Sequence, residues 1–257
     1  MEFINIRGLN WKPEAEYILK NVSVNFHEGS FYGIIGPNGS GKTSLLRHMM
    51  KRIEPEKQEL QLKGQDIHDV RQRDLAREMS WVPQNTSIDV NYTAYQIVMM
   101  GRSPYLRPFQ IESKGDLKLV QEAMEQTNSW QFRNKAFHTL SGGEAQRVIA
   151  ARAIAQDTPI IILDEPVSHL DIRHQKELME TMRLLNKKKG KTILAVLHDL
   201  NLAARYCDKL ILLDKGEIFA QGTPKEVLTC ENLSKVYGLE FYCLEHQETN
   251  GFYLIPK

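Results

Sequence analysis

The 257-residue sequence lacks long hydrophobic runs, a leader pattern, repeats and low-complexity tracts. No apolar stretch approaches the roughly 20 residues that a membrane-spanning helix requires. The first residues, 1–5, do not show the charged and apolar pattern of a secretory signal. These absences predict a cytoplasmic protein. Its length is sufficient for one α/β domain, or for a core with a subdomain.

Excess charge and grouped cysteines are also absent. The 33 basic and 32 acidic side chains leave a formal net charge of +1, which argues against a nucleic-acid binder that acts through a basic field. The three cysteines, Cys207, Cys230 and Cys243, do not have the spacing of a metal site. We therefore expect three reduced thiols that act as small hydrophobic side chains.

A glycine-rich segment at 36–43 has the spacing G-x-x-x-x-G-K-[ST], between an apolar run at 31–35 and an amphipathic one at 44–50. Glycines permit the positive φ angles with which a loop wraps around phosphate oxygens, and a following helix adds its positive end. We expect Lys42 to reach the β and γ phosphates, and the Thr43 hydroxyl to bind Mg²⁺. The segment predicts a nucleoside triphosphate site made of Gly36, Pro37, Asn38, Gly39, Ser40, Gly41, Lys42, Thr43 and Ser44.

A second motif joins a buried strand at 160–163 to two acidic residues. Open α/β sheets bind ligands at the carboxyl ends of their strands, where these residues would lie. Asp164 suits a role in holding Mg²⁺, and Glu165 suits a general base for the water that attacks the γ phosphate. Strand, metal ligand and base therefore come from six consecutive residues.

A third motif, Leu-Ser-Gly-Gly-Glu-Ala-Gln-Arg at 140–147, opens a helix. Ser141, Gly142 and Gly143 present a hydroxyl and backbone donors that suit a γ phosphate. Together with the other motifs, this segment resembles the signature of ATP-binding-cassette (ABC) ATPases, and the resemblance covers nearly the whole chain.

Shorter elements of that family occur in the expected order. Trp11 resembles the aromatic residue that stacks on adenine, with Tyr17 as an alternative. Gln84 resembles the glutamine that senses Mg²⁺ and the γ phosphate and links to the membrane partner. Residues 168–171, which include His169 and end at Asp171, resemble the D-loop, and His198 resembles the switch histidine.

The segments predict an α/β fold: a P-loop NTPase core with an antiparallel β section and an inserted α-helical subdomain. Strands are expected at 3–6, 18–26, 30–35, 61–67, 79–84, 160–163 and 192–197, with a closing hairpin at 210–220. Helical spacing marks 94–100, 114–127, 143–155 and 173–189. We assign 1–86 and 156–240 to the core, 87–155 to the helical subdomain and 241–257 to a tail.

The resemblance implies a head-to-tail homodimer in which Ser141, Gly142 and Gly143 act on ATP bound to the partner copy. ATP closes this dimer and hydrolysis reopens it, which drives a separate permease at the cytoplasmic face of the membrane. Gln84 and the loop 101–108, with Arg102 and Arg107, are expected on the surface that meets the permease.

The segments 98–105, 198–208 and 222–229 resemble ATPases of iron-siderophore, haem and cobalamin importers. This resemblance implies import of a ferric siderophore delivered by a substrate-binding lipoprotein, with haem and vitamin B12 as alternatives. A non-transport ABC ATPase of DNA repair or translation is less favoured, because there is no coiled-coil insertion, cysteine cluster or second cassette. Glu165 and His198 argue against a module that binds ATP without hydrolysing it. An exporter subunit would share all the catalytic motifs.

Overall fold

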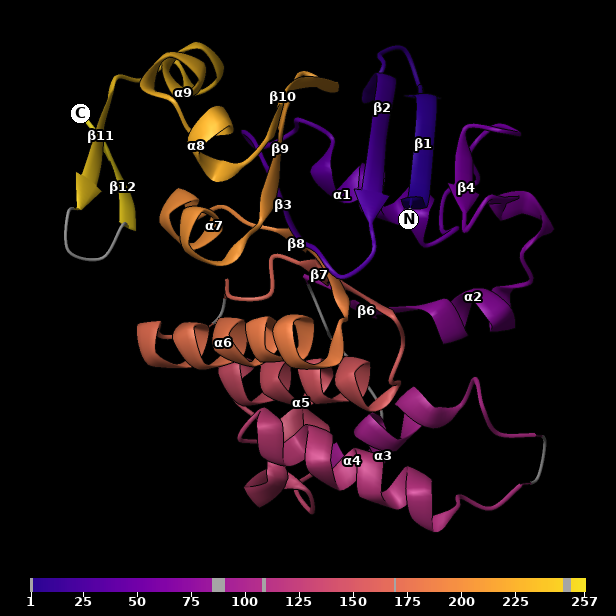
Figure 1. Ribbon diagram of the computed structural model, residues 1–257. Helices are drawn as coiled ribbons and strands as arrows, with labels where there is room; N and C mark the ends of the chain where they lie inside the picture. The colour runs from indigo at the N-terminus through magenta and orange to yellow at the C-terminus, as the bar shows by residue number, and fades with distance from the viewer. Residues whose placement is uncertain (1, 85–90, 108–109, 169, 247–250) are drawn as a thin grey trace. The chain divides into compact units, whose positions relative to one another are not determined.

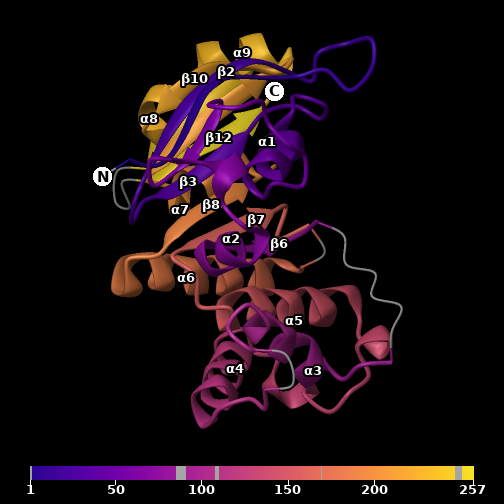
Figure 2. The same ribbon diagram turned by 90° about the vertical axis from the view of Figure 1, so that its right-hand side faces the viewer.

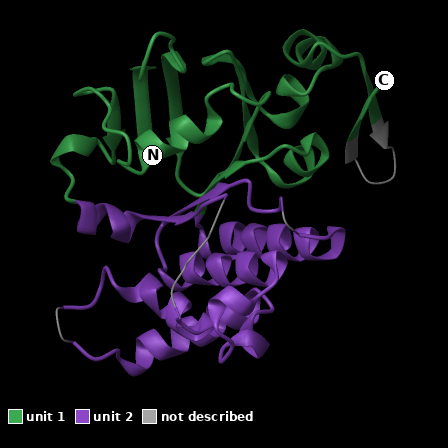
Figure 3. Cartoon of the chain, turned by 180° about the vertical axis from the view of Figure 1, so that it is seen from behind, with its two compact units in different colours: residues 1–71, 192–257 green, residues 72–191 purple. Residues whose placement is uncertain are grey.

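The computed structural model describes residues 2–84, 91–107, 110–168, 170–246 and 251–257. The chain divides into two compact units (Figure 3). Unit 1 combines residues 1–71 with 192–257, and unit 2 is the continuous segment 72–191. In the part of the chain that is described, no helix is long and apolar enough to cross a membrane. The predicted α/β fold class is confirmed, whereas the predicted subdomain boundaries stay a prediction.

Unit 1 contains an antiparallel sheet in the order β2-β1-β4-β5 (Figure 1). Its strands are β1 (Glu2–Trp11), β2 (Leu19–His27), β4 (Leu60–Leu62) and β5 (Gln65–Asp66), followed by the 3₁₀ turn η1 (Ile67–Asp69). In β2 every second side chain from Val22 to Phe26 is buried and those between are exposed. This period of two is the reason that the segment forms a strand with one face in the core.

A second group of strands in unit 1 has the order β10-β9-β3-β8. They are β3 (Phe31–Ile35), β8 (Thr192–Val196), β9 (Lys209–Asp214) and β10 (Glu217–Gly222). β3 runs parallel to both β8 and β9, and all of its residues are buried. An apolar run without alternation is what a parallel strand covered on both faces requires. Its carboxyl end leads through the phosphate loop into α1 (Lys42–Met49).

The C-terminal part of unit 1 carries α7 (Leu200–Tyr206), α8 (Pro224–Val227), α9 (Cys230–Tyr237) and the strands β11 (Phe241–His246) and β12 (Gly251–Pro256). β11 and β12 pair as an antiparallel hairpin where the sequence predicted only a tail. The structure therefore extends regular secondary structure to the end of the chain.

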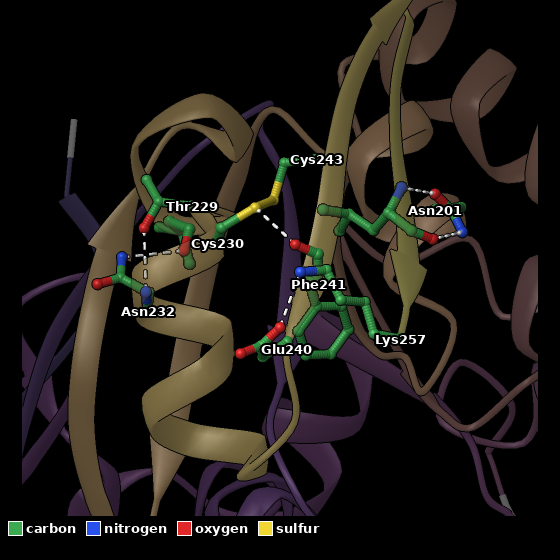
Figure 4. Close-up of a disulfide and its surroundings, with 10 residues drawn as sticks. Asn201, Thr229, Cys230, Asn232, Glu240, Phe241, Cys243 and Lys257 are labelled. Carbon is green, nitrogen blue, oxygen red and sulfur yellow. Dashed lines mark hydrogen bonds and ion pairs between the residues drawn. A yellow bond between two sulfur atoms is a disulfide. The ribbon is translucent and has the colours of Figure 1, made fainter.

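The expectation of three reduced thiols was wrong for two of them. Cys230 and Cys243 form a disulfide that joins α9 to β11, with the two Cα atoms 6.0 Å apart (Figure 4). That distance lies within the range that a disulfide can bridge, and it arises because the chain turns back after α9. Cys207 is buried and is not part of a disulfide. Sequence spacing could not reveal the pairing, since it depends on this turn.

Unit 2 contains α2 (Gln72–Glu78), the parallel strands β6 (Met79–Val82) and β7 (Ile160–Asp164), and the helices α3 (Ala94–Met99), α4 (Lys114–Gln126), α5 (Gly142–Ala155) and α6 (Ile172–Lys189). Short 3₁₀ turns occur at η2 (Met100–Arg102), η3 (Trp130–Phe132) and η4 (Phe137–Thr139). α3 and α4 both contact α5, as Figures 1 and 2 show. The helices expected from the sequence are present in these positions.

Arg102 does not lie on an exposed surface, so its prediction as a permease-facing residue was wrong. It is 7% exposed, and its Nε donates to Asp116 Oδ1 over 2.8 Å. Its Nη1 also donates to the carbonyl oxygens of Ala155 and Gln156, at 2.9 and 3.1 Å. The guanidinium is buried because it lies between the C-terminal end of α5 and α4 and binds groups on both. Arg107 is exposed.

Candidate nucleotide-binding site

Glycine is required at two positions of the phosphate loop by close packing. Gly36, Gly39 and Gly41 have φ angles of 144°, 79° and 101°. A Cβ atom on Gly36 would lie 2.1 Å from the Leu213 carbonyl oxygen, and one on Gly41 would lie 2.9 Å from the Ile18 carbonyl oxygen and 2.7 Å from a methyl carbon of Leu19. Such distances exclude any side chain, whereas Gly39 faces open space. β9 and the start of β2 therefore hold the loop in place.

Two polar side chains of the loop are buried. Lys42 is 6% exposed, and its Nζ donates to the carbonyl oxygens of Gly36 and Pro37 at 2.8 and 2.7 Å. The Ser40 hydroxyl oxygen is buried and has no hydrogen-bond partner among the described residues. A buried unpaired hydroxyl is costly, so it indicates a group that completes the site. Thr43 and Ser44 follow in the first turn of α1. These features fit a bound phosphate chain.

Trp11 lies beside the helix that follows the loop. Its ring meets that of His48, on α1, edge to face with centroids 5.5 Å apart. Burial lowers the pKa of His48, against the opposing effect of a hydrogen bond with the Ser44 carbonyl. Tyr17 is 49% exposed, and the Lys12 ammonium lies 5.2 Å from its ring centre. The structure thus connects Trp11, but not Tyr17, to the phosphate-loop helix, and the adenine-stacking role of Trp11 stays a prediction.

His198 lies two residues after the end of β8, the strand that neighbours β3. The Leu197 N–H donates to the Ile34 carbonyl over 3.1 Å, so the two strands remain paired up to their carboxyl ends. Because β3 and β8 are parallel, the phosphate loop and His198 leave the same edge of the sheet. The side chain of His198 is exposed. Unit 1 therefore brings the phosphate loop and the predicted switch histidine to one edge.

Unit 2 brings three other predicted residues together. β6 pairs in parallel with β7, and Gln84 and Glu165 follow the carboxyl ends of these strands. Gln84 Nε2 donates to Glu165 Oε2 over 2.6 Å. Asp164, the last residue of β7, is 2% exposed, and Glu165 has a φ of +50°. A left-handed conformation is strained for a glutamate, and such strain is concentrated at functional sites.

The signature segment forms the N-terminus of α5. The Ser141 hydroxyl accepts a hydrogen bond from the Glu144 N–H over 3.3 Å, and Glu144 Oε2 accepts one from the Ser141 N–H over 2.9 Å. The bond from the Ser141 N–H lowers the pKa of Glu144. Ser141 and Gly142 are exposed, and Gly143 is half-buried. Our sequence reasoning missed Glu144, although Ser-x-x-Glu is the sequence signature of a capping box.

Asp171 begins α6. Its carboxylate accepts hydrogen bonds from the His174 N–H and ring Nδ1, at 2.9 and 2.8 Å. Both bonds lower the pKa of Asp171, and the backbone bond has the larger effect. The structure thus assigns Asp171 a capping contact, while its role at a nucleotide stays a prediction. His169 lies outside the described residues.

No group of three or more histidine, cysteine or carboxylate side chains within the described ranges could hold a metal ion without other ligands. The residues predicted at the nucleotide belong to both units. Trp11, the phosphate loop and His198 are in unit 1, whereas Gln84, Asp164, Glu165, Asp171 and the signature are in unit 2.

The comparisons with known proteins agree with this arrangement. The sequence profile of the ABC transporter family matches residues 19–168. Ferric enterobactin transport ATP-binding protein FepC of Escherichia coli (strain K12) is 40% identical over 239 residues, which cover 93% of this chain and 88% of FepC. Cobalamin import ATP-binding protein BtuD of Halobacterium salinarum is 36% identical over 91% of this chain, but the match spans only 58% of BtuD.

Two solved structures have the same fold. A metal-chelate type ABC transporter in an inward-facing conformation superposes with a TM-score of 0.86 at 25% identity, over 100% of this chain and 98% of that one. The dimeric ATP-binding cassette MJ0796, bound to ADP and Pi, gives a TM-score of 0.77 at 28% identity, over 86% of this chain and 98% of that one. The motifs, the fold and these matches agree, and the chain belongs to the ABC transporter family, among its ATP-binding subunits.

Proposed function

We propose that the chain binds ATP with Mg²⁺ and hydrolyses it in a head-to-tail homodimer, and that this dimer energises import through a separate permease at the cytoplasmic face of the membrane. The observation that carries the proposal is the phosphate loop. Its lysine lies across the loop carbonyls, and its Ser40 hydroxyl has no partner among the described residues. Both groups are buried, which suits a site that an anion completes.

The role proposed for each residue follows from the sequence motif to which it belongs. The backbone N–H groups of the loop and Lys42 would bind the β and γ phosphates, and the Thr43 hydroxyl, Asp164 and Gln84 would hold Mg²⁺. Bound Mg²⁺ would neutralise charge that develops on the transferred phosphoryl oxygens. Glu165 would accept a proton from the attacking water, and His198 would stabilise the γ phosphate.

The exposed signature supports a shared site. Ser141 and Gly142 face away from the core of their own unit at the N-terminus of α5, where backbone donors favour a negative group. In a head-to-tail dimer these donors would contact ATP held by the phosphate loop of the other copy. The dimeric state of MJ0796 supports this arrangement.

Two open grooves on unit 2 support docking of a permease. One, of about 310 Å³, is lined by Tyr95, Met99, Met100, Leu106 and Leu117, among others. The other, of about 660 Å³, lies between α2 and the segment around Pro104 and includes Arg73 and Arg107. Exposed apolar side chains beside basic ones fit an amphipathic segment of a partner. Gln84 follows β6 in the same unit and donates a hydrogen bond to Glu165. Docking of the permease on this unit would therefore affect the position of Gln84 and, through it, that of Glu165.

Ferric siderophores are the proposed cargo of the transporter. FepC is named for ferric enterobactin, and the superposed ABC transporter is described as a metal-chelate type. Cobalamin and haem remain the alternatives, because BtuD is named for cobalamin import. A substrate-binding lipoprotein would deliver the cargo to the permease.

The test is reconstitution of the chain with its permease and receptor in liposomes. We expect ATP-dependent uptake of a ⁵⁵Fe-labelled siderophore and stimulation of ATP turnover by the loaded receptor. Uptake of labelled cobalamin or haem instead would change the cargo but retain the transport function. ATP turnover without uptake of any of the three would favour a non-transport ATPase.

A further inference from the structure

The C-terminal residues 230–246 and 251–257, which we call the C-terminal brace, connect the two parts of the nucleotide site in unit 1. The brace comprises α9, β11 and β12. The first connection leads to the phosphate loop, because the Tyr237 hydroxyl is hydrogen-bonded to the backbone of Gly36. Tyr237 is the last residue of α9, and its ring meets that of Phe241 edge to face at 6.0 Å. α9 thus ends on the first glycine of the phosphate loop.

The second connection leads to the helix after His198. Asn201 Nδ2 donates to the Leu254 carbonyl over 3.2 Å, and the Leu254 N–H donates to Asn201 Oδ1 over 2.8 Å (Figure 4). The Asn201 N–H in turn donates to Asp199 Oδ1, which caps α7 directly after His198. Leu254 is 4% exposed, so this side of the hairpin is packed. The side-chain amide of Asn201 therefore extends the ladder of β12 to α7.

The disulfide lies beside the contact between Asn201 and Leu254. Cys243 is the direct cross-strand partner of Leu254, the residue that Asn201 binds. Its bond to Cys230 attaches this pair to the first turn of α9. The opposite face of the hairpin is open, since Tyr242, Leu244, Tyr253 and Ile255 are 47–54% exposed.

A two-stranded hairpin is marginally stable by itself, so β11 and β12 depend on these attachments. Both cysteines are only half-buried, which leaves the bond accessible to a reductant. Disulfides in reducing compartments are usually transient or redox-sensing. Loss of the bond would return the brace to its two hydrogen-bonded contacts.

We propose that the C-terminal brace is a redox-sensitive support of the nucleotide site, in which Tyr237 positions the phosphate loop and Asn201 positions the helix that follows His198. The proposal rests on the proposed ATPase function. Opening the bond takes two electrons and two protons from a dithiol, which closes to its own disulfide while Cys230 and Cys243 become thiols. The reduced brace then holds both elements less firmly.

The first experiment compares the oxidised chain with the same chain after reduction by dithiothreitol. Hydrogen–deuterium exchange should become roughly tenfold faster in β12 and α7, because local opening becomes easier. ATP turnover should fall several-fold. The Cys230→Ser/Cys243→Ser chain should match the reduced protein and should not respond to dithiothreitol. Equal exchange and equal turnover in the two redox states would overturn the proposal.

The second experiment separates the two connections. Tyr237→Phe should raise KM for ATP several-fold with little change in kcat, because it releases only the phosphate loop. Asn201→Ala should lower kcat with little change in KM, and Asn201→Asp, which keeps the acceptor for the Leu254 N–H, should restore part of it. Lys235→Ala is the matched control, since its pair with Glu231 lies on the exposed side of α9. If the two variants changed KM and kcat in the same way, the positioning roles would be wrong.

The exchange measurement also separates this proposal from the proposed function. Faster exchange on reduction, in a chain that never hydrolyses ATP, would support the brace and reject the ATPase role. Hydrogen–deuterium exchange that does not depend on the redox state, in a chain that hydrolyses ATP, would support the ATPase role and reject the brace.

Discussion

The two outer glycines of the phosphate loop differ from the middle one in a way that a substitution can measure. Gly36→Ala would place a methyl carbon 2.1 Å from the Leu213 carbonyl, so β9 or the loop must move. We expect this variant to lose at least about 2 kcal/mol of unfolding free energy and its ATP affinity. Gly39→Ala meets no atom and should cost only about 1 kcal/mol, from its left-handed backbone. Urea unfolding and equilibrium nucleotide binding check both. Equal losses would show that packing does not set the requirement.

Glu165 combines a strained backbone with a hydrogen bond from Gln84. Glu165→Gln removes the base but leaves the phosphate loop intact, so ATP should still bind while hydrolysis slows by about 100-fold or more. The measurement is single-turnover hydrolysis, together with the size of the ATP-bound species, which should be a stable dimer. Glu180→Gln, at an exposed position of α6, is the control. Turnover near the wild-type rate would remove Glu165 from the role of base.

At the scale of residues, local motifs can be read from the sequence, whereas contacts between distant residues cannot. The spacing of Lys42 and Thr43 and the order Asp164-Glu165 depend on local motifs, which are readable from a single sequence. The hydrogen bond between Gln84 and Glu165 joins residues far apart in the chain, and it follows only from the pairing of β6 with β7. The burial of Arg102 could not be predicted for the same reason, because its carboxylate partner is on another helix.

Among the elements, η2 and α4 are joined by the buried pair of Arg102 and Asp116, whose side chains are 9% and 10% exposed. Arg102→Ala leaves the carboxylate buried without its cation and should lower the unfolding free energy by about 3 kcal/mol. Arg107→Ala, at an exposed arginine of the same segment, should stay within about 0.5 kcal/mol of the wild type. Chemical unfolding of the two variants makes the comparison, and similar values would contradict the structural role of Arg102.

The same pair gives a pH dependence. The hydrogen bond from the Ser113 hydroxyl, followed by that from Arg102, lowers the pKa of Asp116. Because the folded pKa lies below that of an unfolded aspartate, about 3.9, the stabilisation is complete above that value. It is lost as the pH falls through the folded pKa. Asp116→Asn should therefore flatten the acid limb of stability between about pH 2 and 4, as measured by urea unfolding. An unchanged acid limb would exclude this contribution.

Elements with a clear hydrophobic pattern in their own sequence were predicted correctly. Elements that depend on contacts with distant residues were not. The buried run of β3 and the amphipathic α4 carry their own signals in hydrophobic spacing. β11 and β12 were interpreted as a tail, although two short apolar runs at 241–244 and 252–255 lie close together in the sequence. The disulfide that holds this hairpin joins two cysteines 13 residues apart, a spacing typical of no metal or redox motif.

For the whole molecule, a shared site predicts that two inactive variants should complement each other. Lys42→Ala removes a phosphate contact from one copy, and Ser141→Arg blocks the signature that would serve the other copy. Each homodimer would lack both sites, whereas a mixed dimer would keep one complete site. Random mixing should restore about a quarter of wild-type ATP turnover, because half of the dimers are mixed and each has one of two sites. Turnover that stays absent in the mixture would contradict the head-to-tail arrangement.

Unit 1 is made of two segments that precede and follow unit 2 in the sequence, and this order has a consequence for synthesis on the ribosome. β3 pairs in parallel with β8 and β9, and the loop packs against Leu213, about 180 residues after Gly36. A nascent chain that grows by about 5–20 residues per second therefore waits between about 9 and 35 s before its phosphate loop can close. During that interval unit 2, which is continuous, can fold first. The newly made chain should thus acquire its first nucleotide only near the end of translation.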